Sequence, residues 1–274
     1  MFSPVVHPQH VQLLASLTAA FSLGFLLLLE LSLIPMRKFT LRHSMRPSVA
    51  VFLSSCIVSM ANALCTSGFA ASAFYELTTS SQPISLTMAA PESLVRSCAI
   101  TCAYFIADCY QMVRYREDSK REMGAMGMAI MWFHHSVSLV LWPYSVLTNK
   151  CAFFVSFFLF TEITNIGQNI FHACNKGNLG SKITAVVGSC WLVSFFVVRI
   201  VPMPWLVYHY VKLHWEGGVG QTGLETVVSL VTIPLPWMLN TYWFILLSMK
   251  AIRMLRGGCG TRAQAAPMGT PVLE

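Results

Sequence analysis

The sequence predicts an all-α fold, a polytopic membrane helical bundle of about seven transmembrane helices. Two properties of its composition support this prediction: 55% of the 274 residues are hydrophobic, and only 11% are charged. Soluble domains carry about a quarter charged residues, so the composition excludes that class. The third observation is a series of apolar windows, each of the length of about 20 residues that a helix needs to cross a bilayer.

Seven such windows divide the chain into its expected helices. They are Val11–Ile34, Ser48–Phe69, Ser93–Val113, Ala125–Leu147, Cys151–Phe171, Ile183–Val211 and Leu224–Lys250. Pro202 and Pro204 are expected to kink or end the sixth helix, because proline removes a backbone hydrogen bond. Pro234 and Pro236 are expected to bend the seventh. No basic segment precedes the first window and no cleavage site follows it, so we interpret it as a retained anchor.

Basic residues concentrate in alternate loops. Most of the 18 Lys and Arg residues lie within 37–46, 114–121 and 176–182, or from residue 250 onward. Cytosolic loops are the basic ones in membrane proteins, so we expect a lumenal N-terminus and a cytosolic C-terminus. The net charge of +7 therefore reflects topology. We expect no nucleic-acid partner, because no basic run is interleaved with aromatic residues.

The chain is expected to have three parts. Residues 1–47 form a transmembrane anchor with a basic cytosolic loop, residues 48–256 a membrane domain, and residues 257–274 a disordered cytosolic tail rich in Gly, Pro and Ala. Cys259 in this tail is either a palmitate acceptor or a plain exposed cysteine. The nine cysteines contain no CxxC pair, which favours packing thiols over a disulfide framework or a zinc site.

A pair of histidines, His134 and His135, lies in the middle of the fourth window, which contains no charged residue. An ionisable group at this depth is a functional hypothesis by default, because hydrocarbon offers it no partner. Neighbouring side chains on a helix point about 100° apart, so one ring can act while the other holds position. Ser138 lies within one turn of both. We expect no metal, since further ligands at helical spacing are missing.

The fifth window carries a polar stripe. Glu162, Asn165, Asn169 and His172 are spaced by 3, 4 and 3 residues, which places them on one helical face. Such a face should turn toward the protein interior, because lipid cannot hydrogen-bond to it. Asn side chains often join membrane helices to one another, which is the simpler interpretation. A whole stripe that contains a carboxylate favours substrate contact.

The third window repeats this spacing with Thr101, Tyr104, Asp108 and Gln111. An unpaired Asp at a helix centre costs about 2.5–3.5 kcal/mol, so Asp108 needs a partner. The candidates are Arg199 or a histidine. A purely structural ion pair remains an equal alternative to a functional role for Asp108.

These polar groups are expected to lie at similar depths in the bilayer. A helix rises about 1.5 Å per residue, which places His134, Glu162 and Asp108 near the middle of the bilayer. The sequence therefore predicts a buried polar chamber.

Four segments carry a family resemblance. They are AYFIADCYQM, FHHSVSLV, FTEITNIGQNIF and FFVVRIVPMPW. In this order they resemble the motifs of the TLC-domain family, which includes ceramide synthases, translocation-associated membrane proteins and small TLC-domain lipid-regulatory proteins. The resemblance covers about Phe52 to Arg256. It implies that six helices surround a polar chamber open toward the cytosol, and that the protein resides in the endoplasmic reticulum.

The resemblance also implies a chemistry. In ceramide synthases, paired histidines and nearby aspartates serve the transfer of an acyl group from acyl-CoA to a sphingoid amine, and His134 and His135 match those histidines. The chain departs from that pattern at residues 161–164, where Thr-Glu-Ile-Thr replaces a run with two close aspartates. It is nearest the small TLC-domain proteins, for which membrane-lipid homeostasis is implied.

Three functions follow as hypotheses. The favoured one is membrane-lipid metabolism or homeostasis, with sphingolipid or ceramide among the candidate lipids. The alternative is a ceramide synthase-like N-acyltransferase that uses acyl-CoA as co-substrate and no other cofactor. An ion or solute pathway is third, because no inverted repeat supports it. The sequence leaves open whether the chain forms a homodimer.

Nine residues are candidates for the site. The catalytic candidates are His134, His135, Asp108 and Glu162, and the substrate-binding candidates are Tyr104, Ser138, Asn165, Asn169 and Arg199.

Overall fold

The structure is a computed structural model that describes residues 7–216 and 234–257. Every regular element in these ranges is helical. The elements are α1 (Pro8–Arg42), α2 (Pro47–Thr79), α3 (Glu92–Arg114), α4 (Arg116–Leu147), α5 (Ala152–Phe160), the 3-10 turn η1 (Thr161–Ile163), α6 (Thr164–Lys176), α7 (Ser181–Phe195), the π-helical turn η2 (Phe196–Ile200), α8 (Met203–Glu216) and α10 (Pro234–Gly257). The predicted all-α class is confirmed for these residues.

The predicted windows coincide with long helical stretches. Among the described residues, α1, α2, α4 and the stretch Ser181–Glu216 are long and apolar enough to cross a membrane. α3 has 23 residues but contains Arg96 and Asp108, and η1 divides the fifth window between α5 and α6. Helices of this length and apolarity identify an integral membrane protein built as a helical bundle.

Prolines set several helix boundaries. Pro8 and Pro47 occupy the first turns of α1 and α2, where the missing N–H has no intrahelical partner to lose. The described part of α10 starts at Pro234, so the bend expected at Pro234 and Pro236 involves residues that lie outside the described ranges. A kink near Pro202 is confirmed, because α7 passes through η2 and the chain turns before α8.

Two sequence expectations lie outside the described residues. They are the part of the seventh window before residue 234, and the tail 258–274 with Cys259.

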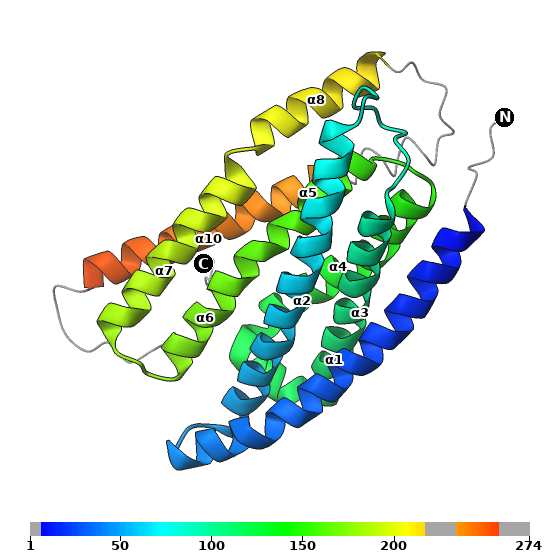
Figure 1. Cartoon of the computed structure of the whole chain (residues 1–274). Helices are drawn as coiled ribbons and strands as arrows, with labels where there is room; N and C mark the ends of the chain where they lie inside the picture. Colours follow the sequence, from blue (N-terminus) through cyan, green and yellow to red (C-terminus); the bar gives the residue numbers. More distant parts are fainter. Residues whose placement is uncertain (1–6, 217–233, 258–274) are drawn as a thin grey trace.

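The bundle has a close-packed centre and two different edges. Several alanines of α2 and α3 are fully buried, among them Ala63, Ala70, Ala99 and Ala103, and such small residues let membrane helices approach closely. α1 lies along α2 and α3 at one edge, while α7, α8 and α10 lie at the opposite edge (Figure 1). α5, between them, is almost entirely buried.

The α1–α2 and α6–α7 turns lie at the same end of the bundle (Figure 1). One carboxylate at this end, that of Glu122, connects helices α2, α4 and α6. Glu122, in the second turn of α4, accepts a hydrogen bond of 2.6 Å from Ser48 at the start of α2 and pairs with Lys176 at the end of α6. Just beyond it, Gly124 adopts φ 78° and ψ 164°, which interrupts α4. Glycine is favoured there, because L side chains rarely adopt a positive φ. The break separates the polar segment 116–123 from the apolar part of α4.

The basic loops predict that the opposite end, with the α2–α3 loop, faces the lumen. An Asn-x-Ser/Thr sequon placed in the exposed residues 80–83 should therefore be glycosylated when the protein is inserted into microsomes. A sequon beside Glu117 should remain unmodified. Gel mobility before and after endoglycosidase treatment measures this, with Gln in place of the sequon Asn as control. The reverse pattern would invert the orientation.

Candidate functional site

The two histidines of α4 serve different partners. His135 is almost completely buried, and its Nε2 lies 2.7 Å from Oδ2 of Asp108 on α3. Ser55 of α2 donates a hydrogen bond of 3.3 Å to the other carboxylate oxygen of Asp108. The partner of Asp108 is therefore a histidine and not Arg199. This carboxylate contact fixes the His135 ring and places the proton on Nε2 when the ring is neutral.

His134 points elsewhere, as the helical spacing predicts. Its ring lies edge-on to Trp243 of α10, with the ring centroids 5.4 Å apart, and 5.5 Å from the ring of Phe105. It lines a cavity between the helices, whereas His135 does not. One turn of α4 thus presents one imidazole to the cavity and the other to Asp108.

The cavity is small and partly polar. Its volume is about 40 Å³, and its wall comes from α3, α4, α5, η1, η2 and α10. The polar lining residues are Thr101, His134, Ser138, Thr161, Glu162, Arg199 and Asn240. One buried water needs about 10–15 Å³ of such space, so the cavity has room for about three water-sized groups. This volume matches a small polar group rather than a whole lipid molecule.

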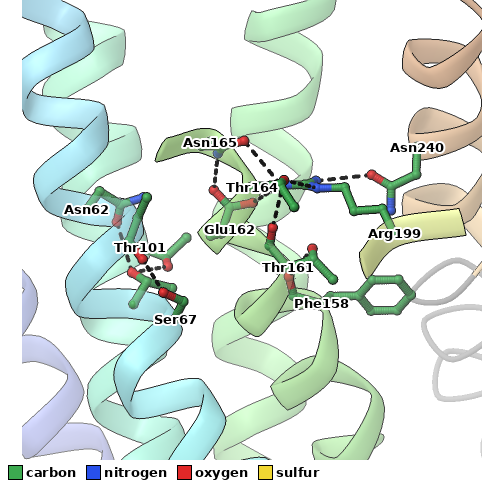
Figure 2. A network of polar contacts seen from close by, with 12 residues as sticks. Asn62, Ser67, Thr101, Phe158, Thr161, Glu162, Thr164, Asn165, Arg199 and Asn240 are labelled. Atoms are coloured by element: carbon green, nitrogen blue, oxygen red, sulfur yellow. Dashed lines mark hydrogen bonds and ion pairs between the residues drawn. The ribbon is translucent and has the colours of Figure 1, made fainter. Parts of the chain in front are cut away.

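One wall of the cavity is a dense hydrogen-bond network around Arg199, drawn in Figure 2. Its Nε donates to Thr164 at 2.7 Å and its Nη1 to Asn240 at 3.1 Å. Its Nη2 donates to Glu162 at 3.3 Å and to Asn165 at 3.2 Å. Asn165 in turn donates to the second Glu162 oxygen at 2.7 Å. The buried cation and the largely buried carboxylate therefore neutralise each other within a satisfied network.

Two local departures from the α-helix position this pair. Arg199 lies on the π-helical turn η2, and π-turns inside helices often occur at functional sites. Glu162 lies on the 3-10 turn η1, which interrupts the continuous helix expected for this window. The members of the predicted stripe have different partners. Asn165 donates to Glu162, which lines the cavity, while Asn169, also on α6, donates to Ser59 of α2 at 2.9 Å.

A second polar group faces this network from α2 and α3 (Figure 2). Thr101 and Thr66 share a hydrogen bond of 2.9 Å, and Thr66 donates to Asn62 at 2.9 Å. Nδ2 of Asn62 is buried without a hydrogen-bond partner in the described structure. Thr101 alone of these three lines the cavity.

The predicted site residues fall into three groups according to how they relate to the cavity. His134, Ser138, Glu162 and Arg199 line the cavity, whereas His135, Asp108 and Asn165 contact or support these residues without lining it. Tyr104 and Asn169 lie farther back, Tyr104 edge-on to the His135 ring with centroids 6.1 Å apart.

Sequence reasoning overlooked the polar face of α2. Ser55, Ser59, Asn62 and Thr66 recur at spacings of 4, 3 and 4, the same periodicity that identified the other two faces. That signal was present in the sequence. Asn240 and Trp243 of α10 carry no comparable pattern.

The described residues contain no group of three or more His, Cys, Asp and Glu side chains placed to hold a metal ion. What the cavity offers a ligand is hydrogen bonding from neutral groups, together with one compensated ion pair.

The Arg199–Glu162 pair predicts a stability test. Removal of one member of a buried pair strands the other charge, at a cost of about 3–5 kcal/mol. Arg199→Met should therefore lower the midpoint of thermal unfolding of the detergent-solubilised protein well below that of the wild type. The double variant Arg199→Met/Glu162→Leu should recover much of the loss, and Lys182→Met, at an exposed position, should have little effect. A double variant as unstable as the sum of the two single ones would show that the residues are not coupled.

Comparisons with known proteins agree with this architecture. The family model of the TLC domain matches residues 53–251, which include both histidines and the Arg199 network. No curated protein matches the chain significantly. A match over most of the chain shows the family: this chain belongs to the TLC-domain family of membrane proteins.

Proposed function

We propose that this protein binds the polar headgroup of a membrane lipid in the cavity and acts in membrane-lipid metabolism or homeostasis. The TLC domain supports a lipid-related function in the broad sense. The observation that carries the finer proposal is the position of His134 and Ser138. Both line the cavity, and neither makes a hydrogen bond to another described side chain. They are therefore available to a ligand.

The electrostatics of the cavity favour a neutral headgroup. Glu162 and Arg199 compensate each other, so the wall offers donors and acceptors without a net charge. A hydroxyl or amide headgroup, as in ceramide and related sphingolipids, suits this lining. A phosphate would bring an uncompensated charge into a low-dielectric site, which is costly. With space for about three water-sized groups, the cavity leaves the lipid chains outside, against the bilayer.

An N-acyltransferase is the second candidate, and the His135–Asp108 contact of 2.7 Å favours it. A histidine held by a carboxylate is a common arrangement for general-base chemistry. Asp108 holds His135, which does not line the cavity, so the ring that would face the substrate is that of its neighbour His134. In this reaction His134 would take a proton from the sphingoid amine as the amine attacks the thioester carbonyl of acyl-CoA. The C–S bond would then break, and the departing thiolate of coenzyme A would receive the proton. Glu162 is less suited to act as a base, because Arg199 and Asn165 already occupy both of its oxygens.

Mass spectrometry of lipids that co-purify with the protein tests the binding proposal. The wild type should retain a neutral lipid that His134→Ala and Ser138→Ala retain at several-fold lower levels, because each variant removes a cavity contact. His43→Ala, an exposed histidine outside the cavity, is the matched control. Equal retention by the wild type and both cavity variants would contradict the proposal.

Radiolabelled acyl-CoA supplied with a sphingoid amine separates the two candidates. If the protein is an acyltransferase, the wild type forms an N-acyl product, and both His134→Ala and Asp108→Asn reduce its rate by at least about 100-fold. A retained lipid without any product favours binding alone. The His43→Ala control guards against loss of activity through general instability.

A further inference from the structure

A cluster of basic and aromatic side chains lies at the end of the bundle where the basic loops gather. The Lys176 ammonium lies 5.5 Å from the ring centroid of Phe52, and the Lys250 ammonium lies 4.9 Å from that of Phe171. Both distances are within the range of a cation–π contact. His172 lies between the two aromatic rings, with centroids 5.2 Å from Phe52 and 5.7 Å from Phe171. Helices α2, α6 and α10 thus build one half-buried basic cluster.

The positive charge of this basic cluster is incompletely compensated. Lys176 pairs with Glu122, which Ser48 holds in place. Among the described residues, no carboxylate pairs with Lys250. A continuous series of ring contacts through Phe52, His172 and Phe171 connects the two ammonium groups, so both belong to the same cluster. A half-buried pair of like charges is unfavourable, and an anion bound between them would relieve the repulsion.

We propose that the basic cluster binds the phosphate of an anionic membrane phospholipid. Lysines bind phosphate as point charges, and basic sites between transmembrane helices at the cytoplasmic face take anionic headgroups. Ile170 and Ile252 are exposed on α6 and α10, within two residues of Phe171 and Lys250, and give lipid chains an apolar surface beside the headgroup. The site is separate from the cavity of the proposed function and does not depend on it.

Native mass spectrometry of the full-length protein tests this site. The protein in a neutral detergent is mixed with equal amounts of phosphatidic acid and phosphatidylcholine that carry identical chains. The wild type should retain phosphatidic acid preferentially. Lys250→Gln should lower the ratio of retained phosphatidic acid to phosphatidylcholine about fivefold, the effect of one basic residue near an anionic surface. Lys182→Gln removes an exposed charge from the start of α7 and should leave the ratio unchanged.

Glu122→Gln gives a second test, in which the expected result is a gain of lipid retention, whereas misfolding would cause a loss. Glutamine keeps an oxygen that accepts a hydrogen bond from Lys176 but removes the competing negative charge, so retention of phosphatidic acid should rise above the wild-type level. Excess inorganic phosphate should displace little of the lipid, because the chains also contact the protein. Equal ratios for the wild type and Lys250→Gln, a fall with Glu122→Gln, or complete displacement by inorganic phosphate would each overturn the proposal.

Discussion

Hydrocarbon offers no hydrogen-bond partner, and this constraint organises the centre of the bundle. The guanidinium of Arg199 reaches Glu162, Thr164, Asn165 and Asn240, and so connects η1, α6, η2 and α10. Each of these hydrogen bonds gives a partner to a polar side chain that would have none if it faced lipid. The relative positions of these elements therefore depend on one buried cation, and the cavity lies where they meet α3 and α4.

The same constraint separates structural polar groups from groups that are available to a ligand. Asp108 is occupied by His135 and Ser55, and both oxygens of Glu162 are occupied by the Arg199 network. His134 and Ser138 have no such partners among the described side chains, although they line the cavity. In a membrane interior, polar groups without internal partners need a reason to be there. A ligand headgroup or bound water supplies one.

The sequence predicted the elements that follow from periodicity and little of what depends on packing. Apolar windows gave the helices, and the angle between neighbouring residues gave the divergence of His134 and His135. The 3-10 turn at Glu162 and the π-turn at Arg199 were not predicted, because both segments have an ordinary helical pattern. In the structure these two turns are joined by the contact between Arg199 and Glu162. The polar face of α2 went unnoticed, since its hydroxyl residues scarcely lower the apolarity of the window.

The cavity volume bears on the choice between binding and catalysis. Acyl transfer brings an amine and a thioester together at one place, whereas the cavity of about 40 Å³ has room for about three water-sized groups. Acyl transfer would therefore need more room than the cavity has in this structure, where Trp243 of α10 lies against His134. A single small headgroup fits within this volume. The His135–Asp108 contact favours acyl transfer, whereas the small volume of the cavity favours the binding of one headgroup.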